Sequence, residues 1–126
     1  MAARFFKCGI CGNLVGLVQE GGGVLTCCNE AMKELVPNTS DGAGEKHVPV
    51  ITIDGNNVKV EIGAVAHPML PEHRIDWIYL LTKQGAQRKW LAAGDEPKTE
   101  FVLEDGDAVV AAYEYCNLHG LWKAEV

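Results

Sequence analysis

The arrangement of cysteines at the start of the chain constrains its fold most strongly. Segment 1–36 has few apolar side chains and precedes a run of turn-forming residues, and domains this small usually need a metal ion or disulfide bonds. Four of the five cysteines lie there, as a Cys-x-x-Cys pair and an adjacent pair: Cys8, Cys11, Cys27 and Cys28. Because four thiolates can enclose one tetrahedral metal ion, the segment is predicted to be a small domain stabilised by a metal.

The four thiolates by themselves do not choose the metal. A structural zinc ribbon is the plainest alternative to an iron centre, although zinc ribbons usually carry a second Cys-x-x-Cys pair. A disulfide between Cys27 and Cys28 would be strained, and an odd number of cysteines fits a disulfide framework poorly. Zinc and iron both remain open at this point.

The rest of the chain has the pattern of an antiparallel β protein. Residues 37–44 are almost all turn formers and are predicted to be a linker. In 45–126 the period-two alternation of half-buried strands is clearest at 58–64, after a hairpin signal, Asp-Gly-Asn-Asn, at 54–57. Six or seven short strands predict an all-β sandwich, and only 30–36 could be helical. The other strand candidates are 48–53, 75–82, 100–103, 108–115 and 121–124.

Charge and hydropathy exclude several classes of partner. The formal net charge of −6 and the pI near 5.1 argue against nucleic acid or an anionic membrane as the main partner. No apolar run approaches the roughly 20 residues of a membrane-spanning helix. The first residues show no secretory signal, so we expect a cytoplasmic protein, in a compartment where thiols stay reduced.

The other candidate metal ligands lie in the second part of the chain. They are His47, His67, His73, Cys116 and His119. Four imidazoles and one thiolate suit an iron ion with one coordination position left open for chemistry. A mononuclear zinc hydrolase and a nucleophilic pair of Cys116 with His119 are alternatives that the residue pattern leaves open.

Together these motifs resemble the desulfoferrodoxin family of two-iron superoxide reductases, over nearly the whole chain. The motifs are Cys8-x-x-Cys11 with Cys27-Cys28, Glu45-Lys46-His47-Val-Pro, His67-Pro-Met with His73, and Tyr115-Cys116-Asn-Leu-His119-Gly-x-Trp-Lys-Ala-Glu. The resemblance implies a desulforedoxin-like Fe(Cys)4 domain at 1–36 and an immunoglobulin-like β-sandwich at 45–126 that carries a second, catalytic iron. It also implies that the four histidines are equatorial ligands and that Cys116 is the axial ligand of this iron.

The activity implied by the resemblance is one-electron reduction of superoxide to hydrogen peroxide at a ferrous centre with an open sixth position. The oxidised iron would be reduced again by an external donor such as rubredoxin. Lys46 would supply local positive charge for the anionic substrate in a protein of net charge −6 and could hold the water that delivers protons. Glu45 would close onto the oxidised iron after turnover, and the protein would be a homodimer.

Two other classes of function compete with this interpretation. The first is a pure electron-transfer protein in which the thiolate site does the work and the sandwich only binds a partner. The second is a zinc-stabilised binding module without redox chemistry. The metal content and the visible spectrum distinguish the three.

Overall fold

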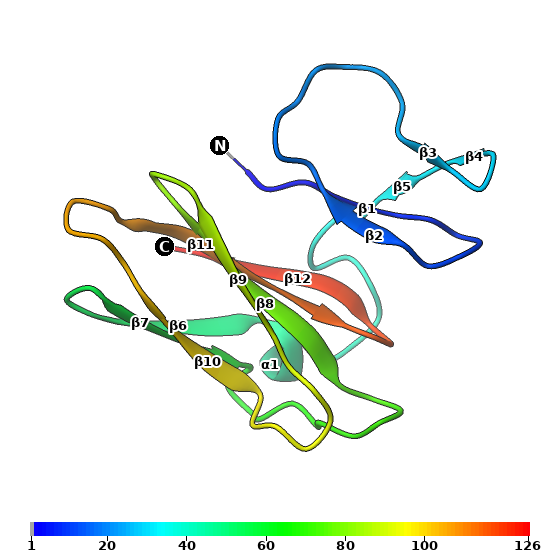
Figure 1. The fold of residues 1–126 in the computed structure, drawn as a ribbon. Coiled ribbons are helices and arrows are strands. Elements are labelled where there is room, and N and C mark those ends of the chain that lie inside the picture. The colour runs from blue at the N-terminus through cyan, green and yellow to red at the C-terminus, as the bar shows by residue number, and fades with distance from the viewer. Residues whose placement is uncertain (1) are drawn as a thin grey trace. The chain divides into compact units, whose positions relative to one another are not determined.

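The computed structural model describes residues 2–126, and the chain divides between Val36 and Pro37 into two compact units, both built mainly of strands (Figure 1). The first unit has two small antiparallel sheets, ordered β2-β1-β5 and β3-β4. Its strands are β1 (Phe5–Lys7), β2 (Leu14–Gly16), β3 (Thr26–Cys27), β4 (Glu30–Ala31) and β5 (Lys33–Glu34). Strands of two or three residues expose most of their side chains, so this unit has the small apolar core that its composition predicts.

The possible helix at 30–36 is not formed. Strands β4 and β5 occupy this segment, and β5 pairs with β1 in the register Phe6↔Glu34 and Lys7↔Lys33. The amide of Leu35 also donates to the carbonyl oxygen of Phe5 at 2.9 Å. These cross-strand bonds satisfy backbone groups that a helix of one or two turns would leave largely unpaired.

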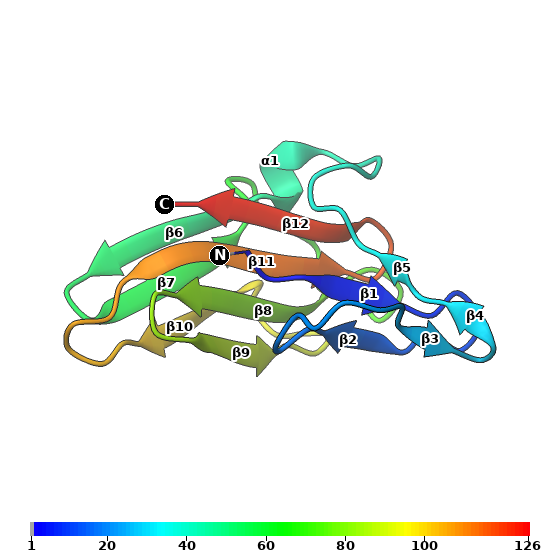
Figure 2. The same cartoon turned by 90° about the horizontal axis from the view of Figure 1, so that it is seen from above.

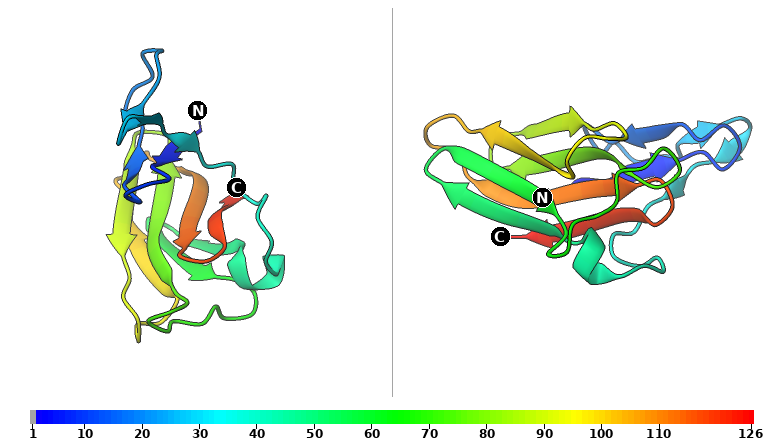
Figure 3. Two further views of the ribbon diagram at one scale, coloured as in Figure 1. Left: turned by 90° about the vertical axis from the view of Figure 1, so that its right-hand side faces the viewer. Right: turned by 90° about the horizontal axis from the view of Figure 1, so that it is seen from below.

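The second unit is an antiparallel β-sandwich of immunoglobulin type (Figures 2 and 3). One sheet has the order β10-β7-β6 and the other has the order β12-β11-β8-β9. Apolar side chains from the facing sides, including Val60, Ile78, Leu80 and Phe101, form the core. The strands are β6 (Pro49–Asp54), β7 (Asn57–Ile62), β8 (Ile75–Thr82), β9 (Ala86–Trp90), β10 (Lys98–Val102), β11 (Val109–Cys116) and β12 (Gly120–Glu125).

The prediction of an all-β sandwich is confirmed, and every strand candidate corresponds to a strand within about two residues at each end. The hairpin signal is confirmed as well, since Asp54 pairs with Asn57 and Gly55 has φ of 60°. Strand β9 was not predicted because its residues, Ala-Gln-Arg-Lys-Trp, show no alternation. It is an exposed edge strand, where polar side chains on both faces cost little.

A single helical turn, α1 (Gly44–His47), precedes β6 and was not predicted. It begins at residue 44, the last residue of the segment expected to be a linker. Its four residues cannot show a helical period, which is why the sequence pattern does not reveal it. Among residues 2–126, no helix is long and apolar enough to cross a membrane.

Candidate metal centres

Five side chains converge at one end of the sandwich and form a cluster that we call the His–Cys centre. His47 ends α1, His67 and His73 lie in the loop between β7 and β8, Cys116 ends β11, and His119 lies in the turn before β12. One ligand atom from each lies within 4.8 Å of those of the other four. The structure therefore brings together all five residues predicted as ligands of the second metal site.

The spacing of the imidazole nitrogens fits metal coordination. The Nε2 atom of His47 lies 3.2 Å from Nε2 of His67 and 3.1 Å from Nδ1 of His119. Two nitrogen ligands at right angles, each about 2.1 Å from a metal ion, lie about 3 Å apart. The rings also make four edge-to-face contacts that close a cycle in the order His47, His67, His73, His119. This is the arrangement expected of four ligands around a plane.

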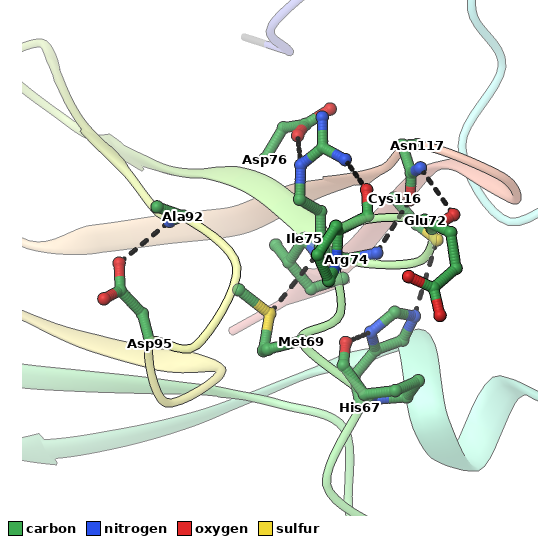
Figure 4. A network of polar contacts seen from close by, with 12 residues as sticks. His67, Met69, Glu72, Arg74, Ile75, Asp76, Ala92, Asp95, Cys116 and Asn117 are labelled. Atoms are coloured by element: carbon green, nitrogen blue, oxygen red, sulfur yellow. Dashed lines mark hydrogen bonds and ion pairs between the residues drawn. The ribbon is translucent and has the colours of Figure 1, made fainter.

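The sulfur of Cys116 is the fifth atom of the cluster. Its Sγ lies 3.4 Å from Nε2 of His67, a contact drawn in Figure 4, and 3.7 Å from Nδ1 of His119. Cys116 is fully buried at a β-bulge, where the register between β11 and β8 shifts from Tyr115↔Trp77 to Cys116↔Ile75. A bulge re-aims a side chain at the end of a strand, here towards the histidines.

Backbone carbonyl groups orient two of the rings. The Nδ1 atom of His47 donates to the carbonyl oxygen of Ala43 at 2.7 Å, and Nδ1 of His67 donates to that of Pro68 at 2.6 Å. Each bond leaves Nε2 as the unprotonated nitrogen, which is the form that binds a metal. The ring of His47 also stacks on Trp122 at 4.8 Å, and Nε1 of Trp122 donates to the carbonyl oxygen of His119 at 3.1 Å.

Burial favours the neutral form of three of the histidines. Desolvation lowers the pKa of His67 to about 4 and lowers the pKa of His47 and of His73. Desolvation also raises the pKa of the Cys116 thiol. The Nε2 atom of His73 is buried and has no hydrogen-bond partner. A metal ion at the centre of the cluster fits these properties. It would bind neutral imidazoles, give the unpartnered nitrogen a partner and supply the nearby cation that the thiol needs in order to ionise.

Glu45 and Lys46 lie next to the His–Cys centre on α1, and both are exposed. After burial, the positive charge of Lys46 is a further cause of the lowered pKa of His47 and His73. The backbone of both residues packs directly on Gly63, where an added Cβ would lie 2.5 Å from the carbonyl carbon of Lys46. The amide of Val65 also donates to the carbonyl oxygen of Glu45 at 2.9 Å, so α1 is held at a defined place beside the cluster.

The four cysteines of the first unit form the second cluster, which we call the tetrathiolate centre. The Sγ atoms of Cys8, Cys11, Cys27 and Cys28 lie within 4.8 Å of one another, and all four are free thiols. The Sγ of Cys27 lies 3.6 Å from that of Cys11 and 3.9 Å from that of Cys28. Sulfur ligands about 2.3 Å from a tetrahedral metal ion lie about 3.8 Å apart, so the spacing fits.

The backbone of the first unit adapts to these thiols. The amides of Cys11 and Ile10 donate to Sγ of Cys8 and lower the pKa of this thiol to about 6, whereas the thiols of Cys11 and Cys8 raise the pKa of Cys27 to about 12. Cys28 has φ of 54°, a left-handed conformation that lets two adjacent cysteines point their sulfurs into one cluster. A cation bound to all four sulfurs replaces the protons for which these crowded thiols, with their opposed pKa shifts, compete.

Several residues around the His–Cys centre were missed by the sequence reasoning. Trp122 and Asn117 belong to a motif that was noted only for its ligands, and Gly63 was interpreted only as an outward-facing position of the strand predicted at 58–64. Glu114 is fully buried with both carboxylate oxygens unpartnered, and desolvation raises its pKa to about 9. The signal for Glu114 is an acidic residue inside an otherwise apolar strand, since its neighbours on β11 are Val, Ala, Tyr and Cys.

A sandwich with a four-imidazole, one-thiolate cluster, preceded by a small four-thiolate unit, defines a class of non-haem metalloprotein with two different centres. Two family profiles match the chain in the same order: Desulfoferrodoxin, N-terminal domain, at residues 2–35 and Desulfoferrodoxin at residues 39–125. The chain belongs to the desulfoferrodoxin family. With this membership, the two ligand clusters are consistent with two iron centres.

Individual relatives match most or nearly all of the chain. The desulfoferrodoxin of Nitratidesulfovibrio vulgaris is 52% identical over 97% of this chain and 95% of its own length. The superoxide reductase of Pyrococcus abyssi is 38% identical and covers 70% of this chain and 91% of its own length. The crystal structure of the superoxide reductase from Treponema pallidum superimposes with a TM-score of 0.83 at 40% identity, covering 99% of this chain and 100% of that one.

Proposed function

We propose that the His–Cys centre is the site at which this chain reduces superoxide and that its five side chains bind the catalytic iron. The observation that carries the proposal is the convergence of four imidazole nitrogens and one sulfur within 4.8 Å of one another. In this assignment the four nitrogen ligands would come from His47, His67, His73 and His119, in the cycle of ring contacts described above. Cys116 would supply the fifth ligand and leave a position for substrate.

The chain is a superoxide reductase, as its family and its solved structural relatives indicate. Superoxide takes up one electron and two protons to become hydrogen peroxide. When bound, ferrous iron supplies this electron and takes one back from an external donor, a role that we assign to a small electron-transfer protein such as rubredoxin. The Cys116 thiolate would donate electron density to this iron, which favours release of the product.

We assign Lys46 and Glu45 opposite roles at the open position. The chain carries a net charge of −6 and repels an anion at long range, so a local positive charge is needed where superoxide enters. Lys46 is exposed, and its charge acts on both His47 and His73, which supports this role. Its ammonium group also holds the water that delivers protons. The carboxylate of Glu45 would be a ligand of the oxidised iron in the resting protein.

The tetrathiolate centre binds the other iron, with Cys8, Cys11, Cys27 and Cys28 as ligands. We accordingly assign residues 1–36 as the desulforedoxin-like domain, 37–44 as the linker and 45–126 as the superoxide reductase domain. Tetrahedral spacing of the sulfurs and the short strands of the first unit support this division. A site in which two of the four cysteines are exposed persists best in a reducing compartment, so we place the protein in the cytoplasm.

We further propose that the chain is a homodimer joined through its first unit. That unit leaves large apolar side chains exposed, and a metal ion cannot cover them. The exposed side chains include Ile10, Val18, Val24 and Val36. Light scattering at micromolar concentration is expected to give twice the chain mass of 13.7 kDa, and a particle of 13.7 kDa would contradict the assignment.

Metal analysis of the anaerobically purified chain, combined with rapid mixing with superoxide, tests the function. We expect about two irons per chain and two ferric chromophores, of which mild reduction bleaches one selectively. The prereduced protein is then expected to form one hydrogen peroxide for each superoxide consumed, without release of dioxygen. A colourless, zinc-loaded protein from iron-replete cells would contradict the proposal and favour a binding module. Reversible redox change at the tetrathiolate centre alone, without superoxide consumption, would favour an electron-transfer protein.

A further inference from the structure

The four histidines of the His–Cys centre are not held in the same way. Carbonyl oxygens of Ala43 and Pro68 fix the rings of His47 and His67, and the backbone of His119 accepts bonds from Trp122 and Ser40. No such bond to the ring of His73 is seen among residues 2–126, and its Nε2 atom is buried without a partner. Apart from its ring contacts with His67 and His119, the position of this imidazole therefore depends on its own backbone.

The backbone around His73 is tied to the backbone of Cys116 by one side chain, that of Asn117 (Figure 4). The amide of Arg74 donates to Oδ1 of Asn117 at 2.7 Å, and Nδ2 of Asn117 donates to the carbonyl oxygen of Glu72 at 3.0 Å. The main-chain amide of Asn117 adds a third bond, to the carbonyl oxygen of Arg74 at 3.1 Å. Asn117 therefore holds the residues on both sides of His73.

The same loop is braced from within, so it moves as one piece. Leu70 and His73 exchange two backbone hydrogen bonds of 2.8 and 3.1 Å. The guanidinium group of Arg74 pairs with the carboxylate of Asp76 at 2.9 Å and also donates to the carbonyl oxygen of Pro71. A rigid loop fixed at both neighbours of His73 transmits the position of Asn117 directly to the imidazole.

We propose that Asn117 is a positioning residue that fixes His73 relative to Cys116, so that the imidazole and the thiolate keep one spacing. The inference rests on the assignment of both side chains as iron ligands under the proposed function. Without the two side-chain bonds, only the main-chain bond from Asn117 to Arg74 still joins the loop at His73 to the turn after Cys116, so the imidazole can shift from its place in the cluster. Loss of the partners that orient ligands typically weakens metal affinity by about 10- to 100-fold.

Asn117→Ala tests the proposal, with Thr82→Ala as the matched control. Thr82 also closes a loop through its side chain, by two bonds of 3.2 Å with Gly85. It ends β8 at the strand terminus opposite Ile75, about 23 Å away at 3.3 Å per residue. Both substitutions remove side-chain bonds to the backbone, but only the first removes bonds between ligand-bearing segments.

The measurement is release of iron to a chelator from the oxidised protein, followed by the visible absorption of each centre. For Asn117→Ala we expect iron to leave the His–Cys centre about 10- to 100-fold faster and its thiolate-to-iron band to shift, while the tetrathiolate centre keeps its wild-type rate. Thr82→Ala is expected to lower the thermal midpoint without changing either centre. Wild-type release and an unshifted band in Asn117→Ala would overturn the inference, as would equal effects in both variants.

A second variant keeps the test decisive where Asn117→Ala does not fold. Asn117→Asp retains the oxygen that accepts from Arg74 but replaces the donor to Glu72 with a carboxylate oxygen, which cannot donate to that carbonyl group, so we expect release to accelerate in the same direction. Wild-type release from this folded variant would overturn the inference. If the wild-type protein itself binds no iron at the His–Cys centre, the proposed function fails together with the inference, whereas a loaded wild type with unaffected variants refutes the inference alone.

Discussion

Gly63→Ala is expected to displace the turn that carries Lys46. The added Cβ would lie 2.5 Å from the carbonyl carbon of Lys46 and 2.7 Å from its Cα, where ordinary contacts begin near 3.4 Å. All the opposing atoms belong to the backbone, so no flexible side chain can rotate away. The backbone of α1 or of the loop after β7 must therefore move by about 1 Å.

The cost of this displacement follows from two estimates. Overpacking of a well-filled site destabilises by about 1–3 kcal/mol, which lowers the thermal midpoint of a unit of this size by about 4–8 °C for each kcal/mol. A misplacement of about 1 Å near reacting groups can slow a reaction by about 10²-fold. We expect both effects, because α1 carries Lys46 and also ends at His47.

Gly44→Ala is the matched control in the same helical turn. A Cβ at Gly44 meets only Cγ2 of Val48 at 3.9 Å, and alanine favours a helix over glycine. Thermal unfolding and the rate of the prereduced protein with superoxide are measured for both variants. If Gly63→Ala unfolds and reacts like the wild type and like Gly44→Ala, close backbone packing on Gly63 is not what places α1.

Lys46→Ala is expected to slow the bimolecular step with superoxide by about tenfold or less and to flatten its dependence on ionic strength, whereas Glu45→Ala leaves that step intact and shifts the ferric absorption band. Pulse-generated superoxide at two salt concentrations checks both variants, and the reverse pattern would contradict the steering argument. Cys28→Ser is expected to reduce the iron content from about two to about one per chain and to increase hydrogen exchange in residues 2–36, while superoxide reduction at the prereduced His–Cys centre survives. Loss of that activity while the His–Cys centre retains its iron would show that the two centres are not independent. In the metal-free protein, His67 is protonated near pH 6.5 in the unfolded chain but only near pH 4 in the folded chain. The free energy of unfolding therefore decreases by up to about 1.4 kcal/mol per pH unit as the pH falls through this window. Urea titrations of the wild type and His67→Gln are expected to converge as pH falls from 6.5 to 4, and parallel curves would show that burial does not depress this pKa.

The amino-acid sequence by itself determined the architecture and the ligand types. Alternation at 58–64 and the Asp-Gly-Asn-Asn turn at 54–57 are local patterns, and they are enough to indicate the β6–β7 hairpin. The four cysteines of the first unit are close in the chain, so their spacing already indicated one metal centre. The nine candidate ligands could be named because soft ligands are few and each lies in a short motif.

The tertiary structure alone decided how these residues act together. Residues 47 and 119 are far apart in the chain, and only the packing of α1 beside β12 brings Nε2 of His47 within 3.1 Å of Nδ1 of His119. The bracing by Asn117 and the contact of Gly63 with α1 also join distant segments, through hydrogen bonds and steric contacts that no periodicity encodes. Helix α1 and strand β9 escaped prediction because a turn of four residues and a polar edge strand are stabilised mainly by their neighbours.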